Sequence, residues 1–246
     1  MYHNISSKFE LSFRSVSSNL LKKHLKLLKN KGFNNITKLD LIKGGLFDNK
    51  KSVFITFDDA YEGVYYSALP VMEEFGFSAA VFIPAGYIGK FNEWDFTPFS
   101  RLRHMDKKML INLSKNGWVV GAHGSTHTDL RKCSNGCLRK EICDSKKKIE
   151  DIIGEEVFLF AYPFGLYNEK VIDMVKNCGY KYAFATANGI TNNRYAISRM
   201  ALYFIDASPI PLLNDRYCRL YLFRNRIISS LSALTPIYKK YIDHLW

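Results

Sequence analysis

No stretch of the 246-residue sequence reaches the roughly 20 consecutive apolar residues that a transmembrane helix needs, so we predict none. The first ten residues, MYHNISSKFE, lack the basic and then apolar layout of a signal peptide. Internal repeats and low-complexity tracts are also missing, which excludes solenoid, fibrous and disordered proteins. We therefore expect a globular cytoplasmic protein, with attachment to the inner face of a membrane as the alternative.

Cysteine is scarce, and its five residues are an odd number. An odd count without a signal peptide favours free thiols in a reducing compartment. Three of them, Cys133, Cys137 and Cys143, lie close together, but their spacing does not match a zinc ribbon. We expect no metal at these cysteines.

Acidic residues are few beside basic ones, 23 against 35, which gives a net charge of +12. Such a surface suits an anionic partner, whether nucleic acid, anionic lipid or an acidic glycan. The basic residues are spread along the chain, so solvated helix faces explain them equally well. Because the sequence contains no nucleic-acid-binding motif, we expect no nucleic acid partner.

Apolar strand-like runs alternate with amphipathic helical stretches along most of the chain. The strand-like runs are 51–57, 78–84, 118–122, 156–163, 181–186 and 194–200. The helical stretches are 15–33, 61–77, 106–117, 137–154 and 168–179. This alternation predicts βα units around a parallel sheet, either a barrel or a doubly wound sheet.

Polar residues follow these strands at the points where they end. Asp58 and Asp59 come after one strand, and His123 and His127 come after another. Further strand ends are followed by Pro163, Phe164 and Gly165, by Arg199 and, after a short first strand at 1–2, by His3. Because the carboxyl ends of parallel strands meet at one edge, we expect these side chains to converge.

Two histidines and a pair of aspartates are a set of residues that suits a metal hydrolase. Adjacent carboxylates repel each other unless a cation or a proton offsets their charge. Two imidazoles and one carboxylate are a common ligand set for zinc, and they leave one position open for water. The second carboxylate is then available as a general base. Neither the FDD sequence nor the HxxxH spacing is specific alone, but together at strand ends they predict this chemistry.

These residues also carry a resemblance to a known family. The stretch FITFDDAYEGVYYSALPVMEEFGFSAAVFIP resembles the first motif region of the polysaccharide deacetylases, the NodB-homology or carbohydrate esterase family 4 group. HGSTH and FAYPFG resemble the second and third motifs. The opening MYHNI and the helix EICDSKKKIEDIIGEEV resemble members from exopolysaccharide gene clusters. The resemblance covers residues 1–205.

The resemblance implies a distorted (β/α) barrel that binds one divalent metal ion. That ion would be zinc, although His₂Asp sites also accept cobalt, nickel or iron. Its ligands would be Asp59, His123 and His127. Asp58 would be the catalytic base, and the backbone N–H of Phe164 would bind the oxyanion.

The reaction implied by the resemblance is removal of an N-acetyl group from an amino sugar in a polysaccharide or a lipid-linked glycan precursor. Tyr162, Pro163 and Phe164 would line the substrate. The alternative is a carbohydrate-binding relative that has lost its activity.

The sequence departs from the family pattern in four places. Ala60 replaces the glycine of TFDDG, which matters only if that position needs a positive φ. Ala161 stands where the third motif has an arginine that orients the base, and the fourth motif has no counterpart. Arg199 replaces the histidine that serves as the general acid.

Arg199 is the most consequential departure, because an arginine is a poor proton donor. In one interpretation, another group donates the proton, and His3 is the candidate. In the second, which we favour, Arg199 replaces the missing arginine and binds Asp58, which then acts as both base and acid. In the third, the protein binds a sugar without hydrolysing it.

The last segment, 206–246, is predicted to be a separate helical extension to the domain at 1–205. Its apolar residues form a helical stripe flanked by arginines. Basic amphipathic helices can lie on anionic membranes, and they can equally pack against the wall of a barrel. Both possibilities stay open from the sequence.

Overall fold

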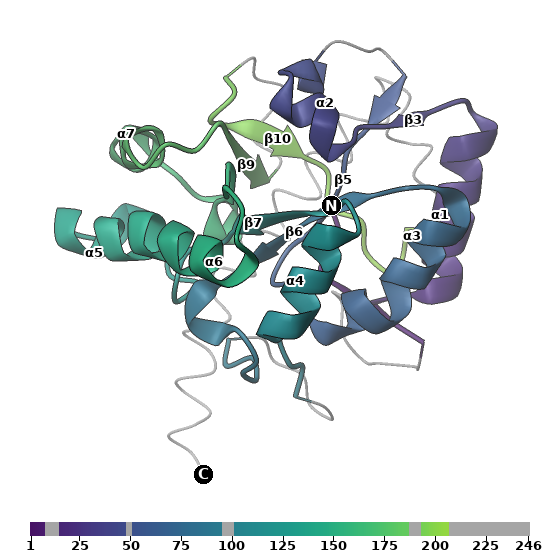
Figure 1. Cartoon of the computed structure of the whole chain (residues 1–246), viewed down its shortest axis with the longest axis horizontal. Helices are drawn as coiled ribbons and strands as arrows, with labels where there is room; N and C mark the ends of the chain where they lie inside the picture. The colour runs from purple at the N-terminus through teal and green to yellow at the C-terminus, as the bar shows by residue number, and fades with distance from the viewer. Residues whose placement is uncertain (8–14, 48–50, 95–100, 187–192, 207–246) are drawn as a thin grey trace.

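A curled sheet of six parallel strands forms the centre of the molecule, and helices cover its outer side (Figure 1). The computed structural model describes residues 1–7, 15–47, 51–94, 101–186 and 193–206. Neighbouring strands follow one another from β5 to β10 in sequence order, with a helix in most connections. The predicted βα alternation and barrel-like parallel sheet are therefore confirmed.

The strands are short, as expected for βα units. They are β1 (Asn4–Ser6), β2 (Ser15–Ser17), β3 (Asn34–Asn35), β4 (Ser52–Val53), β5 (Ile55–Phe57), β6 (Ala79–Ile83), β7 (Val119–Ala122), β8 (Leu159–Ala161), β9 (Tyr182–Thr186) and β10 (Ile197–Arg199). The pairs β1–β2 and β3–β4 form two small parallel sheets beside the main one.

All the helices except α2, which was not predicted, fall on or overlap the predicted amphipathic stretches. They are α1 (Ser18–Asn30), α2 (Lys38–Ile42), α3 (Leu69–Phe75), α4 (Lys107–Lys115), α5 (Asn135–Arg139), α6 (Ser145–Ile153) and α7 (Glu169–Asn177). Two π-helical turns interrupt the helical runs, at Val64–Ala68 before α3 and at Lys140–Asp144 between α5 and α6.

The first two residues link the two edges of the six-stranded sheet. Tyr2 N–H donates to the Thr56 carbonyl at 2.8 Å, and Asp58 N–H donates to the Tyr2 carbonyl at 2.9 Å. On the other side, Leu202 N–H donates to the Met1 carbonyl at 2.9 Å. The sheet is thus curled far enough for β5 and the residues after β10 to approach the same segment.

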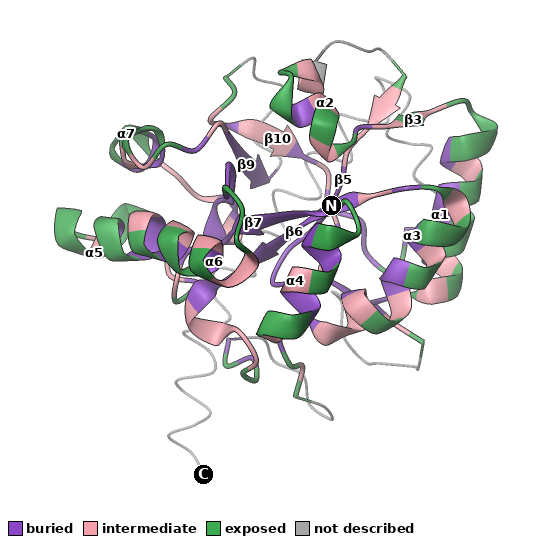
Figure 2. Cartoon of the chain, viewed as in Figure 1, coloured by how far each residue is buried: buried purple, intermediate pink, exposed green. Residues whose placement is uncertain are grey.

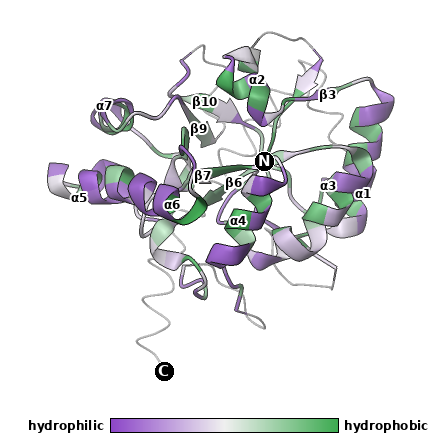
Figure 3. Ribbon diagram, viewed as in Figure 1, coloured by the Kyte–Doolittle hydropathy of each residue, from purple (hydrophilic) through white to green (hydrophobic). Residues whose placement is uncertain are grey.

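The core consists of the strands and the inward faces of the helices. Every residue of β5, β6, β7, β8 and β9 is buried (Figure 2). These strands are largely hydrophobic, whereas the helices alternate hydrophobic and hydrophilic residues (Figure 3). Apolar side chains on both faces of the sheet explain why its strands read as continuous apolar runs.

Local sequence signals set the helix ends. The Ser17 side chain caps α1 by accepting from the Leu20 N–H, and Asp106 caps α4 in the same way. Gly76 and Gly154 end α3 and α6 with left-handed backbone. Glycine takes this left-handed backbone without the steric cost that a Cβ would add.

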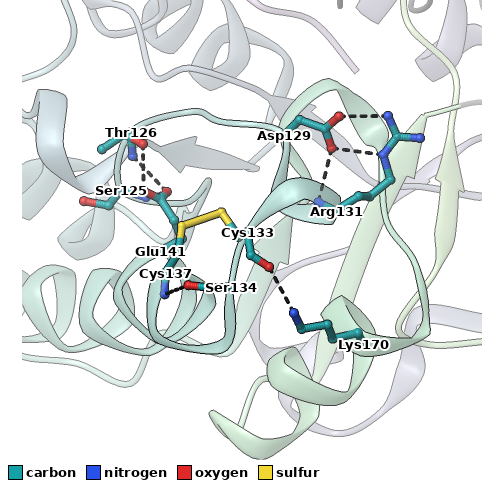
Figure 4. The surroundings of a disulfide bond; sticks show 9 residues. All are labelled: Ser125, Thr126, Asp129, Arg131, Cys133, Ser134, Cys137, Glu141 and Lys170. Carbon is teal, nitrogen blue, oxygen red and sulfur yellow. Dashed lines mark hydrogen bonds and ion pairs between the residues drawn. A yellow bond between two sulfur atoms is a disulfide. The ribbon is translucent and has the colours of Figure 1, made fainter.

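The expectation of free thiols is wrong for four of the five cysteines. Disulfides join Cys133 to Cys137, shown in Figure 4, and Cys143 to Cys178. The Cα atoms of the pairs are 5.3 and 5.2 Å apart, within the range that a disulfide spans. The odd count misled because Cys218, which lies outside the described residues, has no part in these pairs. The free-thiol argument for a reducing compartment falls, and a cytoplasmic location stays a prediction.

One other expectation cannot be compared with the fold. The predicted helical extension comprises residues 206–246, of which 207–246 lie outside the described part of the chain. Among the residues that are described, no helix combines the length and the apolar character needed to cross a bilayer.

Candidate active site

The turn after β5 carries Asp58 and Asp59, and its backbone is strained at Asp59 and Ala60. Asp59 and Ala60 have positive φ angles of 65° and 48°, a region that costs about 1 kcal/mol or more for residues other than glycine. The position of Ala60 therefore does require a positive φ. Two contacts hold the turn: His104 Nδ1 donates to the Asp59 carbonyl at 2.6 Å, and Met105 N–H donates to the Ala60 carbonyl at 2.8 Å.

His123 begins the loop after β7, and its backbone and ring are each held by one of the two neighbouring strands. Its N–H donates to the Ile83 carbonyl at 3.0 Å, and its Nδ1 lies 2.7 Å from the Ala161 carbonyl. A carbonyl only accepts, so Nδ1 carries the proton. In the neutral ring, Nε2 then keeps a lone pair for a cation, the arrangement typical of metal-bound histidines.

His127 ends the same loop and faces the same aspartate. Its backbone is also strained, with φ 54°. Its Nε2 lies 3.4 Å from Asp59 Oδ1, and the Nε2 of His123 lies 3.7 Å from that oxygen. Two nitrogens from the loop after β7 thus meet one carboxylate from the turn after β5, as the positions at the strand ends predict.

These three side chains form a group that fits a divalent metal ion. Ligand atoms of Asp59, His123 and His127 all lie within 4.8 Å of one another, and all three residues are buried. Burying two imidazoles against a carboxylate suits a cation of the zinc type, which takes nitrogen and oxygen ligands and leaves a position for water. The residues present therefore fit the metal that the sequence predicts.

Asp58 lies beside this group and is paired with Arg199. The guanidinium donates to both carboxylate oxygens, at 2.6 and 2.7 Å, across 141 positions of sequence. Burial raises the pKa of Asp58, but the charge of Arg199, aided by His123, outweighs it and lowers the pKa to about 2. Asp58 is therefore ionised at neutral pH.

Arg199 itself is held at the end of β10 by polar and aromatic neighbours. It donates to Thr56 Oγ1 at 3.1 Å and lies over the rings of Phe82 and Phe184, 5.2 and 5.6 Å from their centroids. The expected contact between Arg199 and Asp58 is present, so an arginine on β10 reaches the base that an arginine of the third motif would orient. Its catalytic role stays a prediction.

Phe164 lies in a short 3-10 turn after β8, at Pro163–Gly165. Its φ is 59°, and its ring meets the edge of His127 at 4.6 Å. The N–H groups at the start of a helical turn have no partner within that turn. Gly165 allows the close approach, because a Cβ there would lie 2.6 Å from Thr186.

Three other candidate residues, Tyr162, Pro163 and His3, also lie within the described part of the chain. The Tyr162 side chain is fully buried, and its hydroxyl donates to the Tyr195 carbonyl at 2.8 Å. Its side chain packs in the core, and Pro163 is likewise buried. The substrate-binding role of both residues stays a prediction. His3 is partly exposed, and its charge acts on Asp58 by lowering that carboxyl's pKa.

An aromatic group beside His127 was not found from the sequence. The Trp94 ring is stacked on His127, with centroids 4.4 Å apart and planes 8° apart. Trp94 also packs against Tyr87 and His104. These residues come from the long connection between β6 and α4, so their position in the sequence, away from a strand end, does not indicate that they reach the site.

Comparisons with known proteins relate this chain to the polysaccharide deacetylases. The model of the polysaccharide deacetylase family matches residues 47–183. The Staphylococcus aureus (strain N315) poly-beta-1,6-N-acetyl-D-glucosamine N-deacetylase is 29% identical over 214 residues, which cover 80% of this chain and 71% of that protein. YxkH of Bacillus subtilis (strain 168) is 26% identical over 206 residues, which cover 81% of this chain and 69% of that protein.

A solved structure shows the same fold. The Streptococcus pyogenes deacetylase PplD, in complex with acetate, has a TM-score of 0.72 and 22% identity, over 87% of this chain and 94% of that one. The family match covers more than half of the chain. The chain therefore belongs to the polysaccharide deacetylase family, whose members are hydrolases acting on carbon–nitrogen bonds other than peptide bonds.

Proposed function

We propose that this polysaccharide deacetylase is a metal-dependent enzyme that removes N-acetyl groups from an amino sugar, in a polysaccharide or a lipid-linked glycan precursor. The observation that carries the proposal is the convergence of Asp59, His123 and His127 beside an ionised Asp58. The relative from S. aureus supports poly-β-1,6-linked N-acetylglucosamine as the first substrate to test.

Asp59, His123 and His127 would hold the metal ion. When bound, a divalent ion of the zinc type supplies Lewis acidity toward a water molecule and the amide carbonyl. The negative charge of Asp59 offsets part of the charge of that ion. The Ala161 carbonyl fixes the ring of His123 in the tautomer that a ligand needs.

Asp58 would accept the proton of the attacking water as its oxygen adds to the amide carbon. The pair with Arg199 keeps the carboxylate ionised and fixed in orientation. The same pair makes protonated Asp58 a strong acid, so it can pass the proton to the leaving amine as the C–N bond breaks. The products are acetate and the free amino sugar.

Phe164 and His3 would complete the reaction site. The Phe164 N–H, at the start of its turn, would donate to the oxyanion that develops on the carbonyl. His3 is the alternative proton donor to the amine, since it is close enough for its charge to act on Asp58. Replacing His3 by Gln separates the two routes, because activity persists if Asp58 serves as both base and acid.

Release of free amine from N-acetylated oligosaccharides tests the proposal. Wild type, Asp58→Asn and His123→Ala are compared on β-1,6-linked and other N-acetylglucosamine oligomers, and the metal content of each protein is measured. We expect activity from wild type alone and bound metal in wild type and Asp58→Asn.

One observation favours a second candidate, a carbohydrate-binding relative without activity. Arg199 occupies the place of the histidine that would donate a proton, and a guanidinium stays charged in proteins. Under this alternative, wild type would match both variants on every glycan, yet it would still bind oligosaccharides.

A further inference from the structure

The loop between the two histidines, residues 124–126, is held from one side by the segment after β6. Ala85 N–H donates to the Gly124 carbonyl at 2.9 Å, and Gly86 N–H donates to the Ser125 carbonyl at 2.8 Å. A Cβ on Gly86 would lie 2.6 Å from that Ser125 oxygen, so the approach requires a glycine. These contacts fix the carbonyl groups of the loop and leave its N–H groups to be bound from elsewhere.

Glu141 binds two N–H groups of the same loop (Figure 4). Its Oε2 accepts from the backbone N–H of Ser125 at 2.8 Å and of Thr126 at 3.0 Å. Its Oε1 accepts from Thr126 Oγ1 at 2.6 Å. One carboxylate thus receives three hydrogen bonds from two consecutive residues between His123 and His127.

The position of Glu141 is unusual for an acidic residue. It is only 5% exposed and lies in the π-helical turn between α5 and α6. Burying a carboxylate is costly unless hydrogen bonds compensate for the lost hydration. π-helical turns within α-helices occur frequently at functional sites. The turn and the buried charge are therefore accounted for if this side chain must reach the histidine loop.

We propose that Glu141 is a positioning residue that clamps the histidine loop, so that the Nε2 atoms of His123 and His127 stay directed at Asp59. The proposal rests on the metal-dependent function proposed above. Glu141 acts through the loop backbone and touches neither substrate nor metal. Without it, the two N–H groups would lose their acceptor, and the strained His127 would lose the support that keeps its φ at 54°.

Two substitutions at this position separate geometry from charge. Glu141→Ala removes all three hydrogen bonds. Glu141→Gln keeps them, because the amide oxygen can accept from both backbone N–H groups and the NH₂ can donate to the Thr126 hydroxyl. The matched control is Glu150→Ala on α6, since Glu150 also accepts a backbone N–H, that of Val157 at 2.9 Å, but away from the histidine loop.

Amide hydrogen exchange of Ser125 and Thr126 in the metal-free protein tests the clamp directly. We expect faster exchange at these two amides in Glu141→Ala and near-normal exchange in Glu141→Gln and Glu150→Ala. Equal protection of these two amides from exchange in wild type and Glu141→Ala would overturn the proposal, whatever the zinc affinities of the two proteins are.

Zinc affinity, measured by competition with a chromophoric chelator, tests the consequence. We expect Glu141→Ala to bind Zn²⁺ about 10-fold more weakly or worse, as supporting partners of metal ligands commonly contribute 10–100-fold. Glu141→Gln should recover most of the affinity, and Glu150→Ala should match wild type. Equal affinity in wild type and Glu141→Ala overturns the positioning role. A wild-type protein that binds no divalent metal contradicts the proposed function instead.

Discussion

The helical shell and the loops at the carboxyl ends of the strands differ in where positive φ angles fall. In the shell, these angles belong to glycines that end helices, such as Gly76 and Gly154. At the strand ends, the described residues other than glycine with positive φ are Asp59, Ala60, His127 and Phe164. All four lie in the three sequence motifs, and three of them are proposed to bind metal or oxyanion.

The two regions are also stabilised over different distances in sequence. A helix end such as that of α1 depends on Ser17, three residues from the N–H it caps. The strained turns depend on partners from other elements, His104 for Asp59 and Glu141 for the histidine loop. Local strain maintained by distant contacts is typical of functional sites, where the surrounding structure imposes a conformation that the residues would not adopt alone.

Removing the charge of Asp58 should give the largest effect. Asp58→Asn should lower deacetylase activity by about 10²–10⁴-fold, the range for loss of a general base. It should also lower the free energy of unfolding by about 3–5 kcal/mol, because it leaves the buried Arg199 guanidinium without its counter-ion. Amine release and urea denaturation measure the two effects.

The control for this change lies on the shell. Asp151→Asn alters an exposed carboxylate on α6 and should stay within about 0.5 kcal/mol of wild type with full activity. An equal loss of activity in Asp58→Asn and Asp151→Asn would contradict the difference proposed here between the strand ends and the helical shell.

Truncating Trp94 should come next, since it removes the ring stacked on His127. Trp94→Ala should lower the free energy of unfolding by about 3–5 kcal/mol, as for other buried aromatic residues, and should weaken zinc binding by exposing one face of the imidazole. Trp94→Phe keeps a flat ring and should retain most of the metal affinity. Equal zinc affinity in the Ala and Phe variants would show that the stacking does not support His127.

The sequence sufficed for the shell and for half of the site because both depend on local patterns. Apolar periodicity predicts α1 and α4, and the ends of apolar strand-like runs predict the positions of Asp59 and His123. The residues that support the site show no such local pattern. His104, Trp94 and Glu141 contact the motif residues only after a long connection or a π-helical turn brings them there, and nothing in their immediate sequence predicts that approach.

The pair of Asp58 and Arg199 should give a smaller effect that depends on pH. The pKa of Asp58 is lowered from 3.8 to about 2, so the unfolded chain binds more protons between these values. The stabilisation is therefore present above about pH 4 and is lost as the pH falls toward 2; it amounts to about 2 kcal/mol. In urea denaturation of the metal-free proteins, the difference between wild type and Arg199→Met should shrink by about that amount from pH 5 to pH 2.

An exposed ion pair provides the comparison for this experiment. Arg131 donates to both oxygens of Asp129, at 2.9 and 2.8 Å, but its side chain is 42% exposed (Figure 4). Arg131→Met should change the free energy of unfolding by less than about 1 kcal/mol at any of these pH values, because solvent screens the pair. If the effect of Arg131→Met depended on pH as strongly as that of Arg199→Met, burial would not explain the strength of the Asp58–Arg199 pair.

The smallest effect is expected from the shell itself. Ser17→Ala removes the side-chain oxygen that accepts the Leu20 N–H at 3.1 Å, and loss of such a cap costs about 1 kcal/mol. The midpoint of thermal unfolding should fall, while zinc affinity and activity below that midpoint should equal those of wild type. Because a capping defect frays one end of α1 without reaching the strand ends, a fall in zinc affinity would mean that the site takes its order from the shell rather than from its own contacts.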